Sequence, residues 1–177
     1  AVSRWLSSRA EKAALAQQMP AAPGFQPTKS AERFIALMQY CQNAPDLGVI
    51  AGGAGIGKTT SIAEYRRREP NVFMVTAQPV MTSATNLLYE LTQVLDLPEG
   101  PPAKMSRAIV RKLRGMNALV IIDEAQHLPT AALNQARTIH DLSGCGLVFV
   151  GNETVYSRMG DGRAEFAQLF SRVGMKV

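Results

Sequence analysis

Short apolar segments alternate with longer amphipathic segments along the 177-residue chain. Four of the short segments, at residues 47–51, 72–76, 118–122 and 146–150, are almost entirely apolar. A strand with apolar side chains on both faces is typical of a parallel sheet that is covered by helices on both sides. Helical segments between successive strands favour the same arrangement. The pattern therefore predicts an α/β fold in which helices sandwich a parallel sheet.

Amphipathic spacing predicts the helices that connect these strands. The expected helices span residues 30–42, a segment that ends near 68, and residues 83–95, 104–114, 130–142 and 164–173. In the first of them Ser30 is the expected N-cap. Its apolar face consists of Phe34, Ile35, Leu37, Met38 and Cys41. The pair Ser143 and Gly144 is the expected stop of the helix at residues 130–142.

Composition indicates a soluble globular protein and a boundary between a terminal segment and one compact domain. The sequence is 46% hydrophobic and 19% charged, as in an ordinary soluble globular domain. No apolar run approaches the length of a membrane span, so we expect a cytoplasmic protein with no membrane partner. Residues 1–24 are expected to form a basic helix and a Pro/Gly linker, and residues 25–177 one compact domain. Cys41 and Cys145 lack metal-site spacing and are interpreted as buried structural thiols.

Residues 52–60 read GGAGIGKTT and directly follow the first apolar segment. This is a phosphate-binding loop of the Walker A type between a strand and a helix. Its glycines let backbone N–H groups point into one cup around phosphate groups. Lys58 is expected to bind between the β- and γ-phosphates of ATP, and Thr59 to bind Mg²⁺. The other expected nucleotide-binding residues are Gly52, Gly53, Ala54, Gly55, Ile56, Gly57 and Thr60. The alternative is a glycine-rich turn without a ligand.

Two acids and an amide follow later apolar segments. Asp123 and Glu124 come after residues 118–122, as in a Walker B motif. Asp123 is expected to hold Mg²⁺ through its water shell, and Glu124 to orient and deprotonate the water that attacks the γ-phosphate. The alternative is an acidic pair that caps the next loop. Asn152 follows residues 146–150 at the carboxyl edge of the sheet, where it could bind the γ-phosphate or that water; the alternative is a Gly-Asn turn.

Two arginines near the end of the sequence are candidates for contact with the nucleotide of a neighbouring subunit. Arg172 ends the amphipathic segment at residues 164–173 and is our first choice for an arginine finger. Such a finger stabilises the charge that develops in phosphoryl transfer. Arg163 is the second choice. The alternative for Arg172 is a favourable charge at a helix C-terminus or a surface ion pair.

The expected helix at residues 104–114 is basic, in a chain of net charge +5. No acid occurs between residues 100 and 122, whereas five cations do: Lys104, Arg107, Arg111, Lys112 and Arg114. Such a run is usually a solvated face, and the absence of compensating acids makes phosphate contact an equal alternative. Aromatic residues make up only 6% of the chain, so we expect contact with a duplex backbone and not base stacking.

In this order, GGAGIGKTT, LVIIDEAQHL, VFVGN and LFSRV resemble the motifs of an AAA+ ATPase. Over nearly its whole length the chain also resembles the DNA transposition protein B family typified by phage Mu. The residues that carry this narrower resemblance are Arg4-Trp5-Leu6, Glu64-Tyr65-Arg66-Arg67, Ser106-Arg107-Ala108, Asp123-Glu124-Ala125, Gly151-Asn152-Glu153, Val155-Tyr156-Ser157 and Glu165-Phe166-Ala167 to Arg172. The resemblance implies an ATPase, stimulated by DNA and by oligomerisation, that uses ATP and Mg²⁺. It also implies helical homo-oligomeric filaments on duplex DNA, bound without sequence preference, and activation of a transposase in the host cytoplasm.

The resemblance is incomplete at both ends of the sequence. Members of the family have an amino-terminal helix-turn-helix domain and a carboxyl-terminal helical lid domain that these 177 residues do not include. We therefore expect an ATPase-domain fragment whose fifth strand is incomplete.

Three other functions remain open: a helicase loader or replication-initiator ATPase, a small P-loop kinase, and a nucleotide-dependent interaction module. The acid pair at residues 123–124, Asn152 and Arg172 favour water activation and subunit contact over the bound acceptor hydroxyl of a kinase.

Overall fold

The protein is described here over residues 25–155 of a computed structural model. Within that range, four parallel strands form one sheet in the order β1-β4-β3-β2. They are β1 (Leu47–Ala51), β2 (Val72–Thr76), β3 (Leu119–Asp123) and β4 (Gly146–Gly151). This confirms the predicted α/β fold with a parallel sheet, and each strand lies within one residue of its predicted position.

The helices are α2 (Lys29–Asn43), α3 (Lys58–Arg68), α4 (Ala84–Val94), α5 (Pro102–Leu113) and α6 (Thr130–Ser143), with a short 3₁₀ helix η1 (Ala125–His127). In this described part of the chain, none of them is both long and apolar enough to cross a bilayer. The predicted basic helix and linker of residues 1–24, the predicted helix at residues 164–173 and the predicted incomplete fifth strand lie outside the described residues. Residue 25, the predicted start of the compact domain, is the first described residue.

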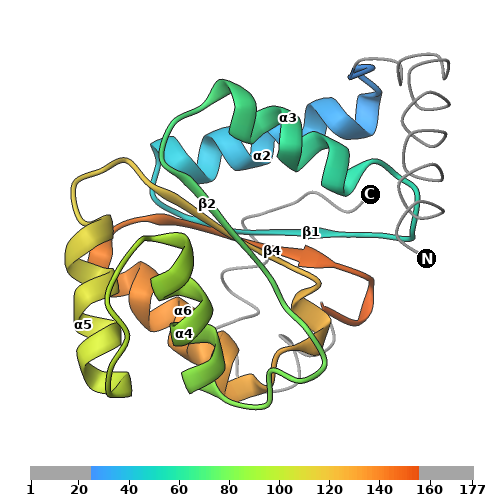
Figure 1. Ribbon diagram of the computed structural model, residues 1–177. Coiled ribbons are helices and arrows are strands. Elements are labelled where there is room, and N and C mark those ends of the chain that lie inside the picture. The colour runs from blue at the N-terminus through green and yellow to red at the C-terminus, as the bar shows by residue number, and fades with distance from the viewer. Residues whose placement is uncertain (1–24, 156–177) are drawn as a thin grey trace, which may run out of the picture.

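The central strands place their side chains alternately into two apolar layers. On β3, Leu119 and Ile121 belong to the layer under α2 and α3, whereas Val120 and Ile122 belong to the layer under α4, α5 and α6. Figure 1 shows these two groups of helices on opposite faces of the sheet. Because successive side chains of a strand point to opposite faces, a strand covered on both sides must be apolar throughout. The strand β2 is an edge of the described sheet, and most of its side chains are only partly buried.

Two helices begin earlier than the sequence predicted. The N-cap of α2 is Thr28 and not Ser30, because the Thr28 hydroxyl accepts a hydrogen bond from the Ala31 N–H over 3.1 Å. Two hydroxyl residues lie two positions apart, and the local sequence does not distinguish them. Helix α5 begins at Pro102 instead of Lys104, since proline, with its fixed φ and no N–H, fits the first helical position.

One buried amide joins the helices α2 and α3 to the amino edge of the sheet. The Gln42 Nε2 donates to the Pro70 and Asn117 carbonyls over 3.0 and 2.9 Å. The Tyr65 hydroxyl of α3 donates to the Gln42 Oε1 over 2.6 Å. Because residues 70 and 117 precede β2 and β3, Gln42 fixes the entry into both strands as well as the end of α2.

Candidate nucleotide-binding site

The strand order brings the predicted parts of the site to one edge of the sheet. Strand β4 lies between β1 and β3, so the carboxyl ends of these three strands are neighbours. β1 leads into residues 52–60, β3 ends at Asp123, and Asn152 follows β4. The Gly52 N–H donates to the Gly151 carbonyl over 3.2 Å, which joins the start of the loop to the end of β4. Three segments that are distant in the sequence therefore meet where an open α/β sheet binds its ligand.

The loop after β1 has room for a ligand beside its backbone. Gly55 and Gly57 have φ angles of 82° and 89°, a left-handed conformation that favours glycine. At Gly53 φ is not in that region, and within the described residues a Cβ added there would meet no atom within 4 Å apart from its neighbours in the chain. Nothing inside the described protein requires a glycine at 53, whereas close approach of a phosphate to the backbone does. Ile56 packs against the core under α2 and α3 and anchors the loop.

Lys58 is the first residue of α3 and lies over the loop. Its Nζ donates to the carbonyls of Gly52 and Gly53 over 2.7 and 2.8 Å. These bonds hold the ammonium group at the mouth of the loop, beside the positive end of the α3 dipole. Thr59 and Thr60 are exposed on the first turn of the same helix. Loop glycines, lysine and hydroxyls thus lie together at the start of α3.

Asp123 is a buried carboxylate at the end of β3, where only 5% of the residue is exposed to solvent. Its Oδ1 accepts a hydrogen bond from the Glu124 N–H over 2.9 Å. Burial raises the pKa of Asp123 above its ordinary value, the negative Glu124 raises it further, and the N–H bond and the positive Lys58 oppose the shift. In residues 25–155 no group of three or more His, Cys, Asp or Glu side chains gathers as a metal site. Mg²⁺ is commonly held by one or two carboxylates together with substrate phosphates, so Thr59 and Asp123 fit that cation only with a nucleotide present.

Glu124 has a left-handed backbone conformation, with φ 53° and ψ 35°. For a residue with a side chain this conformation costs about 1 kcal/mol or more, and such strain is common at functional sites. The conformation turns the chain sharply from β3 into η1. The Gln126 Nε2 donates a short hydrogen bond to the Glu124 Oε2, and the Asn152 N–H donates to the Gln126 Oε1 over 3.3 Å.

Gln126 was not among the predicted site residues. Its only sequence signal is an amide two positions after an acid, and its contact with Asn152 depends on the neighbouring positions of β3 and β4. Asn152 itself is exposed, and its Oδ1 accepts hydrogen bonds from the N–H and hydroxyl of Thr154. Asn152 therefore forms a turn directly after β4, at the carboxyl edge of the sheet, and its contact with the γ-phosphate or the attacking water stays a prediction.

With this geometry in place, similarity to known proteins decides the family. Residues 42–159 match a family model described as an AAA domain. The chain belongs to the AAA domain family. This membership confirms the resemblance to an AAA+ ATPase core.

The narrower resemblance of this AAA domain is also confirmed. It is 39% identical over 168 residues to the "Mu-like prophage FluMu DNA transposition protein B" of Haemophilus influenzae, covering 92% of this chain and 58% of that protein. It is 37% identical over 180 residues to the "ATP-dependent target DNA activator B" of Escherichia phage Mu, covering 99% of this chain and 56% of that protein. The chain therefore spans little more than half the length of these relatives.

A solved structure supports the fold alone. The crystal structure of Cdc6p from Pyrobaculum aerophilum matches with a TM-score of 0.60 and 15% sequence identity. The match covers 86% of this AAA domain and 46% of that chain.

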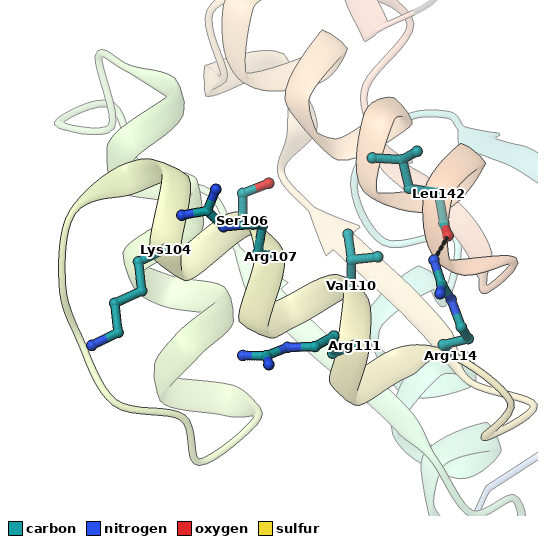
Figure 2. A pocket seen from close by; sticks show the side chains of 7 residues that line it. All are labelled: Lys104, Ser106, Arg107, Val110, Arg111, Arg114 and Leu142. Atoms are coloured by element: carbon teal, nitrogen blue, oxygen red, sulfur yellow. Dashed lines mark hydrogen bonds between the residues drawn. The ribbon is translucent and has the colours of Figure 1, made fainter.

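The predicted DNA-binding residues of the AAA domain lie apart from the nucleotide site. A pocket of about 350 Å³ lies beside α5 and the end of α6, and Figure 2 shows the residues that line it: Lys104, Ser106, Arg107, Val110, Arg111, Arg114 and Leu142. We call it the basic pocket. In the described range none of its four cations makes an ion pair, and Arg114 instead donates to the Leu142 carbonyl over 3.0 Å. Lys112 is exposed on α5 but does not line the basic pocket.

The remaining predicted site residues, Arg163 and Arg172, lie outside the described residues.

Proposed function

We propose that this AAA domain binds and hydrolyses ATP and that, through ATP, it controls binding to target DNA and activation of a transposase. The observation that carries the proposal is that the loop at residues 52–60, Asp123 and Glu124 lie at the same carboxyl edge of the sheet. Support for the biological role comes from relatives named as an ATP-dependent target DNA activator and a DNA transposition protein.

Each residue of the proposed site has its own role in ATP hydrolysis. Backbone N–H groups of the loop and the ammonium of Lys58 bind the phosphates, and Thr59 and Asp123 hold Mg²⁺. Bound Mg²⁺ would neutralise phosphate charge. Glu124 accepts a proton from a water molecule while the water oxygen forms a bond to the γ-phosphorus. The bond from that phosphorus to the β,γ-bridging oxygen breaks, and ADP leaves with the electron pair. Asn152 orients the water or the γ-phosphate.

The basic pocket is the proposed contact with duplex DNA. Its cations Lys104, Arg107, Arg111 and Arg114 have no acidic partners among the described residues, so they are available to neutralise phosphates. Lys112 adds a further positive charge on the same helix. Contacts of this kind supply affinity without sequence preference, which fits a protein that binds many different target sites.

Assembly on DNA completes the proposal. In a helical homo-oligomer, Arg172 would reach the nucleotide of the adjacent subunit, with Arg163 as the second choice. Such a trans-acting arginine makes hydrolysis depend on neighbours and hence on the DNA that gathers them.

Two substitutions test the hydrolytic site. Lys58→Ala is expected to weaken ATP binding, because it removes the charge at the mouth of the loop. Glu124→Gln is expected to leave binding intact and stop turnover, because it removes only the base. Nucleotide affinity and phosphate release with duplex DNA measure the two effects. Glu153→Gln, an exposed acid at the same edge, is the matched control. Wild-type turnover in Glu124→Gln would overturn the proposed role of this residue.

A further inference from the structure

The amide of Gln126 connects two strand ends of the nucleotide site. Its Nε2 donates to the carboxylate of Glu124, which follows β3, and its Oε1 accepts from the N–H of Asn152, which follows β4. Gln126 belongs to η1 and is half-buried. A single side chain therefore contacts both the proposed base and the backbone of the residue proposed to orient water or phosphate.

The end of β4 leaves room for this amide at Gly151. A Cβ added to Gly151 would lie 2.2 Å from the Gln126 Oε1 and 2.5 Å from the Val155 Cγ2. Real Cβ atoms do not approach other atoms so closely, so any larger residue at 151 would displace Gln126 or the turn that contains Val155. Gly151 differs in this respect from Gly53, where an added Cβ would be free of close contacts with the described residues other than its chain neighbours.

We infer that Gln126 is a positioning residue that couples Glu124 to the end of β4. The inference rests on the proposed function, in which Glu124 acts on water. A glutamate side chain has high rotamer freedom, and fixing it in one position costs conformational entropy. The Gln126 donor holds Oε2 of Glu124 and leaves Oε1 to accept the proton. Because the other end of the amide is bound to Asn152, a shift of Asn152 toward a bound γ-phosphate would move the carboxylate with it.

Matched substitutions at Gln126 separate positioning from packing. Gln126→Met keeps the length of the side chain and removes its hydrogen bonds to Glu124 and Asn152. Gln126→Glu keeps an acceptor for the Asn152 N–H but replaces the donor to Glu124 with a negative charge. We expect kcat for ATP hydrolysis to fall about tenfold or more in Gln126→Met and at least as much in Gln126→Glu, with little change in KM. Gln93→Met, which removes one hydrogen bond to the Glu99 carboxylate, is the control and should keep kcat.

Two further variants keep the test decisive. Gly151→Ala displaces the amide without removing it, so kcat should fall there too, even if Gln126→Met folds poorly. In Glu124→Gln, adding Gln126→Met should lower the residual turnover no further, because both changes act on one group.

The outcomes separate this inference from the function on which it rests. If Glu124→Gln keeps wild-type turnover, the proposed hydrolytic site is wrong. If Glu124→Gln is inactive while folded Gln126→Met and Gly151→Ala keep wild-type kcat, only the coupling through Gln126 is overturned. If Gln126→Met lowers thermal stability and leaves kcat unchanged, the role of Gln126 is purely structural.

Discussion

Two acids of the chain have opposite pKa shifts because their surroundings differ. Asp123 is buried at the end of β3, and burial raises its pKa above the ordinary value of 3.8. Glu64 on α3 accepts hydrogen bonds from Arg67 and Arg68, which lower its pKa to about 2. The ionised form is therefore favoured at Glu64 and disfavoured at Asp123. At the scale of single residues, Asp123 lowers the stability of the protein when it is ionised, whereas the proposed function needs the ionised carboxylate to hold Mg²⁺.

Asp123→Asn is expected to stabilise the protein in the absence of nucleotide. Since the native pKa of Asp123 is raised, its contribution to stability is fully present below the unfolded pKa and is lost as the pH rises through the native pKa. Asn keeps a similar shape and stays neutral, so the gain in melting temperature over wild type should be larger at neutral pH than at about pH 4, near the ordinary pKa of an aspartate. Asp96→Asn, an exposed acid, is the control for thermal unfolding at each pH. A variant no more stable than wild type at neutral pH would contradict the argument.

At the scale of elements, the close contact between α2 and β4 depends on Gly146. An added Cβ at Gly146 would lie 2.3 Å from the carbonyl oxygen of Cys41 and 2.9 Å from the Leu119 Cδ1. The Cys41 carbonyl is backbone at the end of α2, next to Gln42, whose hydrogen bonds fix that end. The first residue of β4 can therefore carry no side chain unless α2 moves.

Gly146→Ala is expected to lower the free energy of unfolding by about 1–3 kcal/mol, as other overpacked core substitutions do. The physical reason is displacement of the α2 backbone, which no side-chain rotamer can relieve. Urea unfolding measures the change. Gly100→Ala is the matched control, because its Cβ would lie 3.6 Å from the flexible Lys104 side chain. Equal stability of the two variants would show that α2 adjusts to the new methyl group.

At the scale of the whole molecule, the two proposed binding sites lie at different ends of the strands. The nucleotide site is at the carboxyl ends of β1, β3 and β4. The basic pocket includes Arg114, which lies between the end of α5 and the amino end of β3, and Leu142 near the end of α6, which precedes β4. Figure 1 shows α5 and α6 on the face of the sheet opposite α2 and α3. ATP and DNA would thus contact separate surfaces of one domain.

Replacing Arg107 and Arg111 with Ala should weaken duplex binding similarly on all sequences. Each phosphate contact that is lost should reduce the slope of log affinity against log salt by about one. Binding titrations at several salt concentrations measure this slope. Lys29→Ala with Arg33→Ala is the matched control, since it removes two exposed cations from α2 on the opposite face. An unaltered slope in the folded α5 variant would identify these arginines as a solvated face.

Arg172→Ala should lower ATP turnover by about a thousandfold if Arg172 acts across a subunit boundary. ATP binding by a single subunit should survive, because the loop at residues 52–60 is unchanged. Mixing gives the sharper measurement: Arg172→Ala keeps the base and Glu124→Gln keeps the finger, so co-assembly of the two should restore part of the activity. A mixture that co-assembles and stays inactive, together with a stronger defect in Arg163→Ala, would assign the finger to Arg163.

The sequence by itself determined the elements and the residue types of the site. Apolar periodicity is a local property, so the four strands and the intervening helices of the described range were predicted closely, apart from the N-cap of α2 at Thr28 and the start of α5 at Pro102. The loop at residues 52–60 was recognisable because phosphate binding needs glycines, a lysine and a hydroxyl within one short segment. The Asp123-Glu124 pair could be recognised in the same local way.

Only the tertiary structure decided which of these segments are neighbours. The order β1-β4-β3-β2 places Asn152 between the phosphate-binding loop and Asp123, and local spacing carries no information about that order. The contact of Gln126 with Asn152 spans 26 residues of sequence, and the one between Arg114 and Leu142 spans 28. Such contacts arise from the packing of strands and helices that are far apart along the chain. That packing places Gln126 between Glu124 and Asn152 and adds Leu142 to the basic pocket.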